Sequence, residues 1–124
     1  MAKILLVDDN ATLLKHQGEF LRLAGHEVIL APDGKQAMRL VQTQAFELVI
    51  TDLVMPEKEG IEIIRELRQS HPALKIIAMS GGGRGDAKDY LAIAKVLGAS
   101  QVLAKPFSGQ ELLQAVSAAL QGAA

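Results

Sequence analysis

The 124-residue sequence has no cysteine and no tryptophan, and its aromatic side chains are limited to three phenylalanines and one tyrosine. The lack of cysteine excludes disulfide bonds and thiolate metal sites, and makes a reducing compartment, the cytoplasm, the default expectation. So few aromatic side chains give poor support to a surface that stacks nucleic-acid bases. The net charge of −1 and the absence of a long basic run also argue against a nucleic-acid partner.

Long apolar runs are missing too. No run approaches the roughly 20 apolar residues needed to span a bilayer, and the first one, residues 4–7, meets Asp8 and Asp9 too early for a signal peptide. Linkers, repeats and low-complexity segments are also absent. We therefore expect one domain over residues 1–124, with no membrane partner and no output domain. Its 49% of hydrophobic residues suffices for a core without cross-links.

What the sequence does contain is an alternation of short apolar runs with segments of helical periodicity. The expected strands cover residues 3–7, 27–31, 47–51, 75–79 and 101–104. The expected helices cover residues 11–24, 35–43, a segment from after Pro56 to about Ser70, 87–97 and 109–120. This pattern predicts an all-parallel sheet with helices on both faces and right-handed crossovers.

The first expected helix has Asn10 as its N-cap and Gly25 as its stop signal. Its apolar residues are expected to face the core. They are Leu13, Leu14, Phe20, Leu21 and Leu23.

Polar side chains mark the ends of four of the expected strands. Asp8 and Asp9 follow the first strand, Asp52 the third, and Ser80 and Lys105 the fourth and fifth. The carboxyl ends of parallel strands share one edge of a sheet, where open α/β sheets place their ligand sites. We therefore expect three carboxylates, a hydroxyl and an ammonium group to converge there.

The chemistry of this set follows from its charges. Three crowded carboxylates repel one another unless a cation is present. Oxygen-only ligands in small number suit Mg²⁺, for which Mn²⁺ could substitute. An aspartate beside such a metal can attack a phosphoryl group, with a lysine and a hydroxyl stabilising the phosphoryl oxygens. We predict Asp52 as this phosphoryl acceptor, with Lys105 and Ser80 as its catalytic partners.

These motifs resemble those of bacterial response-regulator receiver domains, of the stand-alone type similar to the chemotaxis regulator. The resemblance covers the whole chain and implies a doubly wound, flavodoxin-like α/β fold with five parallel strands in the order 2-1-3-4-5 and five helices. The matching motifs are Val7-Asp8-Asp9, Asp52-Leu53-Val54-Met55-Pro56 with Gly60 beyond it, Ser80-Gly81 and Lys105-Pro106-Phe107.

The resemblance also implies roles for individual residues. Asp52 would be the phosphorylation site, and Asp9 would bind Mg²⁺ directly and Asp8 through water. Asp52 and the backbone carbonyl of Val54 would complete the metal ligands that the protein supplies.

Further roles concern the switch. Ser80 would be the hydroxyl that closes on the phosphoryl group, and Lys105 its ionic partner. The bond between Lys105 and Pro106 would be cis.

Two positions depart from the family pattern. Val102 stands three residues before Lys105, where the family usually has the tyrosine or phenylalanine of its switch. The segment from Ser80 to Lys105 is about three residues longer than usual, with the extra length in residues 81–86. The four glycines there suggest a mobile loop that orders around the phosphorylated state. Neither Val54 nor Gly82, at the positions that tune hydrolysis in the family, can position a water with its side chain.

The resemblance implies protein partners on both sides of the reaction. A sensor histidine kinase or a histidine phosphotransfer protein would donate the phosphoryl group, and the domain would catalyse only its own phosphorylation and dephosphorylation. A downstream protein would bind the face formed by the fourth helix, fifth strand and fifth helix. The chain itself would be a monomer or a weak dimer.

Three alternatives stay open. The chain could be a receiver that acts by protein binding without phosphorylation. It could be a Mg²⁺-dependent phosphatase with an aspartyl-phosphate, although Val54 stands where such enzymes need a second acid. It could also be a nucleotide-binding α/β domain, although the phosphate-loop motif is missing.

Overall fold

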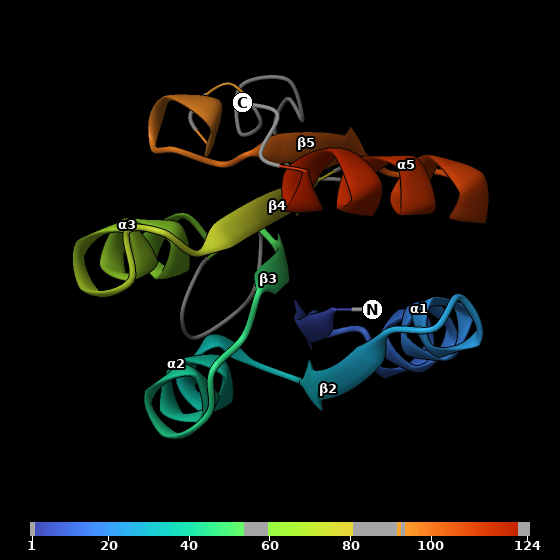
Figure 1. Ribbon diagram of the computed structural model, residues 1–124, viewed down its shortest axis with the longest axis horizontal. Coiled ribbons are helices and arrows are strands. Elements are labelled where there is room, and N and C mark those ends of the chain that lie inside the picture. Colours follow the sequence, from blue (N-terminus) through green and yellow to red (C-terminus); the bar gives the residue numbers. More distant parts are fainter. Residues whose placement is uncertain (1, 54–59, 81–91, 93, 122–124) are drawn as a thin grey trace.

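The computed structural model describes residues 2–53, 60–80, 92 and 94–121 (Figure 1). Val54, Gly81 and Gly82 lie outside the described residues, and so does the glycine-rich segment 81–85. None of the helices in the described ranges has the length and apolar character needed to cross a bilayer.

The centre of the fold is a five-stranded parallel sheet, as predicted. Its strands follow the order β2-β1-β3-β4-β5. Their bounds are β1 (Lys3–Val7), β2 (Glu27–Ala31), β3 (Leu48–Asp52), β4 (Lys75–Ser80) and β5 (Gln101–Ala104). The predicted bounds of β3 were wrong by one residue at each end: the strand begins at Leu48 rather than residue 47 and ends at Asp52 rather than residue 51. The phosphoacceptor candidate is therefore the last residue of the central strand, paired with Met79 of β4.

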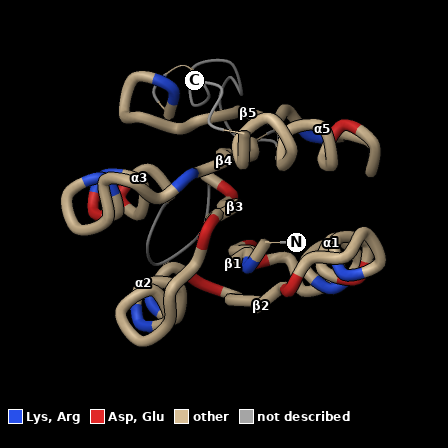
Figure 2. The backbone as a smooth tube through the Cα atoms, viewed as in Figure 1, with Lys and Arg blue, Asp and Glu red and all other residues tan. Residues whose placement is uncertain are grey.

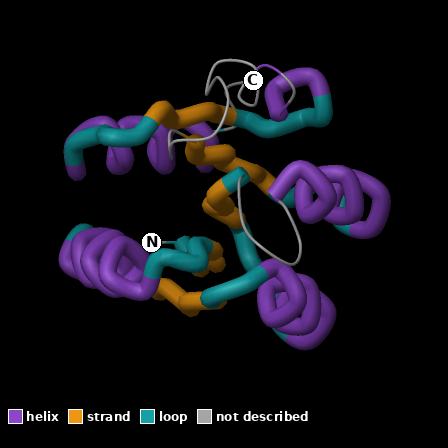
Figure 3. Tube along the Cα trace, turned by 180° about the vertical axis from the view of Figure 1, so that it is seen from behind, coloured by secondary structure: helices purple, strands orange, loops and turns teal. Residues whose placement is uncertain are grey.

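Helices cover both faces of this sheet. They are α1 (Ala11–Leu23), α2 (Gly34–Thr43), α3 (Gly60–Ser70) and α5 (Gly109–Leu120). Ala92 and residues 94–96 are also helical and belong to the helix predicted over 87–97. Seen from either side, α1 and α5 lie on one face of the sheet, and α2 and α3 lie on the other (Figures 1 and 3). The structure is thus the predicted doubly wound α/β fold.

Each face of the sheet has its own core, because alternate strand residues point to opposite sides. Val49 on β3 and Leu53 just after it join the core beneath α2 and α3, whereas Leu48 and Ile50 join the core beneath α1 and α5. All five residues of β3 are buried. A strand covered on both faces reads as a continuous apolar run, and this pattern made it recognisable in the sequence.

Side-chain caps begin three of the helices whose loops border the carboxyl edge, namely α1, α2 and α5. The side chain of Asn10 accepts the backbone N–H of Leu13 at 3.1 Å, which confirms the predicted cap of α1. Ser108 and Glu111 form a capping box at the start of α5. These caps satisfy backbone groups that a helix leaves unpaired, and they fix where the chain leaves the strand ends.

The predicted inner face of α1 was partly wrong. Leu14 and Leu21 are buried as expected, but Phe20 is 38% exposed and Leu23 is 87% exposed. The buried stripe follows Leu14, Gly18 and Leu21, at steps of four and three residues that match a helical turn. Leu23 lies two residues past this stripe and therefore points outward.

Paired substitutions on α1 test this orientation. We expect Leu21→Ala to lower the free energy of unfolding by about 2–5 kcal/mol, because it opens a cavity beneath the helix. Leu23→Ala removes the same atoms from an exposed position and should change it by less than about 0.5 kcal/mol. Urea denaturation at equilibrium measures both values. Equal losses would contradict the orientation of α1.

Candidate functional site

The carboxyl edge of the sheet gathers the side chains that the sequence singled out. Asp8 directly follows β1, Asp52 ends β3 and Ser80 ends β4, and all three side chains are buried. Lys105 directly follows β5 and is half-buried. Buried polar groups are uncommon unless they are paired or functional. This edge is therefore the candidate site.

Three carboxylates form the acidic part of the site. One oxygen atom each from Asp8, Asp9 and Asp52 lies within 4.8 Å of the other two. Asp8 and Asp52 are buried, whereas Asp9 is exposed, so solvent reaches the cluster from the side of Asp9. An all-oxygen set at this spacing fits a hard divalent cation. The cluster could hold such a metal ion.

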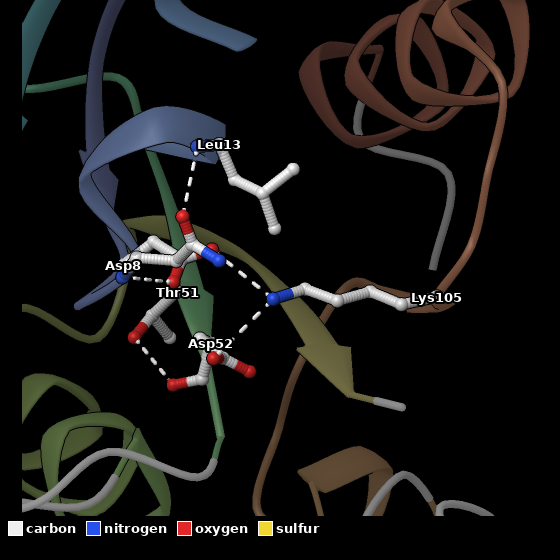
Figure 4. Close-up of polar contacts among 6 residues, drawn as sticks. Asp8, Leu13, Thr51, Asp52 and Lys105 are labelled. Carbon is white, nitrogen blue, oxygen red and sulfur yellow. Dashed lines mark hydrogen bonds and ion pairs between the residues drawn. The ribbon is translucent and has the colours of Figure 1, made fainter. Parts of the chain in front are cut away.

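Lys105 extends toward the cluster from the end of β5, which is an edge strand of the sheet. Its Nζ lies 3.1 Å from Oδ2 of Asp8 and 3.3 Å from Oδ2 of Asp52 (Figure 4). One ammonium group thus faces two of three carboxylates, and the site as a whole keeps an excess of negative charge. That excess favours the binding of a further cation.

The surroundings of Lys105 keep it charged. Burial alone would lower its pKa, but the attraction of Asp8 and Asp52 outweighs burial, and the pKa of Lys105 is raised above its ordinary value of 10.5. A raised pKa means that the ammonium stabilises the fold fully below pH 10.5 and loses this effect only as the pH rises through the folded value. Lys105 is therefore a cation throughout the neutral range.

Backbone contacts hold two of these side chains in place. Oδ1 of Asp8 accepts the N–H of Asn10 at 3.0 Å, which leaves Oδ2 to face Lys105. The N–H of Lys105 donates to the carbonyl of Ser80 at 2.7 Å. The peptide bond between Lys105 and Pro106 is cis. A backbone hydrogen bond thus joins the ends of β4 and β5, while Asp8 is held by the turn that follows β1.

The remaining predicted positions lie apart or outside the described part of the chain. Val102 is half-buried on β5, opposite Ala78 of β4, and packs against the core beneath α2 and α3. The backbone carbonyl of Val54, and Gly81 and Gly82, are not among the described residues.

Sequence reasoning missed one residue beside the site. Thr51 is fully buried on β3, and its hydroxyl donates to the backbone carbonyl of Asp52 at 3.0 Å. The signal for it was a hydroxyl residue at the end of an otherwise apolar run, directly before the acceptor candidate.

Comparison with known families shows to which family the chain belongs. The model of the response regulator receiver domain matches residues 4–117. The chain belongs to this family. Receiver domains are signalling switches rather than classical enzymes, and they take phosphoryl groups from histidine kinases and act on downstream targets.

Two curated relatives are longer proteins, and the chain matches about half of each. The chain is 37% identical over 121 residues to the transcriptional regulatory protein CpxR of Klebsiella pneumoniae, covering 98% of the chain and 50% of CpxR. It is 31% identical over 119 residues to the alkaline phosphatase synthesis transcriptional regulatory protein PhoP of Bacillus subtilis, covering 96% and 48%. This receiver domain therefore spans about half the length of either relative.

Solved structures agree with the fold. A receiver domain protein of Clostridium thermocellum superposes with a TM-score of 0.90 at 31% identity, over 98% of this chain and 96% of the other. The chemotaxis protein CheY4 of Vibrio cholerae gives a TM-score of 0.87 at 30% identity, over 97% and 99%. The receiver fold thus covers nearly the whole chain.

A metal titration tests the acidic cluster. We expect MgCl₂ to raise the melting temperature of the receiver domain, because an ion that binds only the folded state stabilises it by about 2.7 kcal/mol at 100 times its Kd. Asp8→Asn should abolish most of this rise, although its amide oxygen can still accept the N–H of Asn10. The measurement is thermal unfolding with KCl at matched ionic strength as the blank.

The matched control is Asp33→Asn, which replaces the N-cap of α2 by an equally good cap and leaves all three carboxylates of the cluster in place. It should respond to MgCl₂ as the wild type does. An equal rise in Asp8→Asn and the wild type would show that the cluster does not bind the ion.

Proposed function

We propose that this receiver domain is a phosphorylation-dependent switch in which Asp52 accepts a phosphoryl group in the presence of Mg²⁺. The observation that carries the proposal is the convergence of Asp8, Asp9, Asp52 and Lys105 at one edge of the sheet. A single strand-to-helix turn could not supply these groups, because they come from the ends of three strands, β1, β3 and β5.

The carboxylates of Asp8, Asp9 and Asp52 would hold the metal ion, together with the carbonyl of Val54 that the family resemblance implies. When bound, Mg²⁺ neutralises negative charge on the attacking carboxylate and on the phosphoryl oxygens. Mn²⁺ has the same ligand preference and could replace it.

Asp52 is proposed as the nucleophile because it ends the buried central strand β3 and the family resemblance assigns it this role; its carboxylate belongs to the acidic cluster and lies 3.3 Å from the ammonium of Lys105. A carboxylate oxygen attacks phosphorus, and a P–O bond forms. The P–N bond to the imidazole of a phosphohistidine donor breaks, and its electron pair leaves on the imidazole nitrogen. The product is an aspartyl-phosphate, and the donor is a sensor histidine kinase or a histidine phosphotransfer protein.

Lys105 and Ser80 would act on the transferred group. The ammonium of Lys105 already lies 3.3 Å from Asp52 and stays protonated, so it can stabilise charge on the phosphoryl oxygens without moving far. Ser80 ends the neighbouring strand with a buried side chain, and its hydroxyl would donate to a phosphoryl oxygen. Movement of Ser80 toward that oxygen would begin the conformational switch.

The output would be read on the face that includes β5, α5 and the helical residues 94–96. Val96 supports this assignment, because it is apolar and 87% exposed. Val102 replaces the usual aromatic residue on β5, so we propose that the signal reaches this face without an aromatic side chain changing its position. A partner protein that prefers the phosphorylated state would shift the equilibrium toward it.

Phosphorylation by acetyl phosphate tests the acceptor. We expect intact-mass spectrometry to show one added phosphoryl group on the wild type in the presence of Mg²⁺ and none after chelation with EDTA. Asp52→Asn should stay unmodified, because an amide cannot act as the nucleophile. Asp33→Asn is the matched control and should be modified like the wild type. A wild type that binds Mg²⁺ but is never modified would leave a receiver that acts by binding alone.

Substitution of Lys105 tests whether its ammonium group stabilises the charge on the phosphoryl oxygens, while the acceptor Asp52 stays in place. Lys105→Met keeps Asp52 but removes the positive charge, and we expect the phosphorylation rate constant to fall about 10²- to 10³-fold. The control is Lys15→Met on the exposed side of α1, which should react at the wild-type rate. Rates come from quenched time courses at saturating Mg²⁺. A wild-type rate in Lys105→Met would rule out this role for the ammonium group.

A further inference from the structure

In the described part of the chain, Thr51 is the one buried polar residue that the proposed chemistry does not use. Among the described residues, the buried polar or charged side chains are those of Asp8, Thr51, Asp52 and Ser80. Three of them belong to the site, whereas the fourth lies on the adjacent position of β3. Alternation along the strand places its side chain on the core face beneath α2 and α3, away from the carboxylates.

The peptide group that follows Asp52 is held at both ends. The hydroxyl of Thr51 donates to the Asp52 carbonyl at 3.0 Å (Figure 4). The N–H of Leu53 donates to the carbonyl of Met79 on β4 at 2.9 Å. A peptide group is planar, so two hydrogen bonds at its opposite ends fix its orientation about the chain.

The first residue of α3 packs against the same carbonyl. A Cβ atom at Gly60 would lie 2.1 Å from the Asp52 oxygen and 2.8 Å from the Cα of Leu53. The N–H of Gly60 donates to the Leu53 carbonyl at 3.1 Å. The helix therefore approaches the strand end so closely that the Asp52 carbonyl has little space in which to rotate.

We propose that Thr51 is a positioning residue that sets the direction of the Asp52 carboxylate through the backbone. This inference rests on the proposed function and concerns the orientation of the carboxylate that would accept the phosphoryl group. The hydroxyl does not touch the reacting atoms. It fixes the Asp52–Leu53 peptide, and this peptide determines how Cα of Asp52 presents its side chain to Asp8 and Lys105.

The tolerance of the site makes such positioning necessary. Metal ligands and nucleophiles must be held within about 0.5 Å of their productive geometry. The Asp52 carboxylate has two positions to keep at once. It lies within 4.8 Å of carboxylate oxygens of Asp8 and Asp9, with which it would share a metal ion, and 3.3 Å from the ammonium of Lys105. A rotated peptide would move it away from both, and removing an outer support of this kind typically costs 10- to 100-fold in metal affinity.

The experiment compares Thr51→Val, which has nearly the same shape but no hydroxyl, with Thr51→Ser, which keeps the donor. Isothermal titration calorimetry with MgCl₂ alone gives the Kd for the ion, without any phosphodonor. We expect the Kd of Thr51→Val to rise about 10-fold or more, and that of Thr51→Ser to stay within about twofold of the wild type. Phosphorylation by acetyl phosphate at saturating Mg²⁺ should slow in Thr51→Val and stay normal in Thr51→Ser.

Val49→Ala is the matched control for stability. Val49 is fully buried on the same strand and on the same face as Thr51, two residues earlier. It should lower the melting temperature while leaving the Kd for Mg²⁺ unchanged at a temperature where all variants are folded. If Thr51→Val does not fold, Thr51→Ala is titrated in its place.

The inference is overturned if Thr51→Val behaves like Val49→Ala, with a lower melting temperature but a normal Kd and a normal rate. It is also overturned if Thr51→Ser loses affinity as strongly as Thr51→Val. Failure of the proposed function is a separate result. A wild type that binds Mg²⁺ but accepts no phosphoryl group rejects that function, and the Kd values alone still decide the role of Thr51.

Discussion

The mutual repulsion of three carboxylates at one edge of the sheet is the constraint on which the site depends. Asp8, Asp9 and Asp52 lie close enough to share one ion, and Asp8 and Asp52 are buried, where water screens their charges poorly. Lys105 offsets part of this repulsion, and its pKa is raised because it faces two of the carboxylates. The remaining negative charge makes the fold receptive to a divalent cation. In the proposed function, a bound cation and a transferred phosphoryl group would change the electrostatics of this edge in opposite directions, and a switch needs such a change.

The fold supplies this arrangement through topology and backbone contacts. The order β2-β1-β3-β4-β5 places the ends of β1, β3 and β4 side by side, and Lys105 reaches them from the end of β5. The charged residues lie mostly at the ends of elements and in helices, as the distribution along the chain shows (Figure 2). The interior positions of the strands carry no charged residue. Because the central strand is buried on both faces, its last residue is held rigidly, and the hydroxyl of Thr51 and the close approach of Gly60 extend that rigidity to the next peptide.

Much of this could be predicted because apolar runs and charges alternate sharply along the chain. Four of the five strands end within one residue of a polar group that proved to lie at the site, and parallel topology was enough to bring these groups together. The outward side of α1 was harder to predict. Phe20 and Leu23 are apolar, and the buried stripe includes Gly18, which has no side chain to signal burial. Thr51 was missed because a hydroxyl residue at the end of an apolar run marks only an unusual position, whereas its hydrogen bond to the carbonyl of Asp52 is visible only in the structure.

The central claim is that the carboxylate of Asp52 forms a covalent bond to phosphorus. Reduction of the phosphorylated protein with borohydride tests it directly, because an acyl phosphate is reduced to an alcohol and an aspartate so modified becomes homoserine. Tandem mass spectrometry of the resulting peptides then locates the residue. The account predicts homoserine at position 52 and at no other aspartate, only in samples treated with phosphodonor and Mg²⁺. Homoserine at position 8 or 9, or a phosphoryl group that borohydride leaves in place, would contradict it.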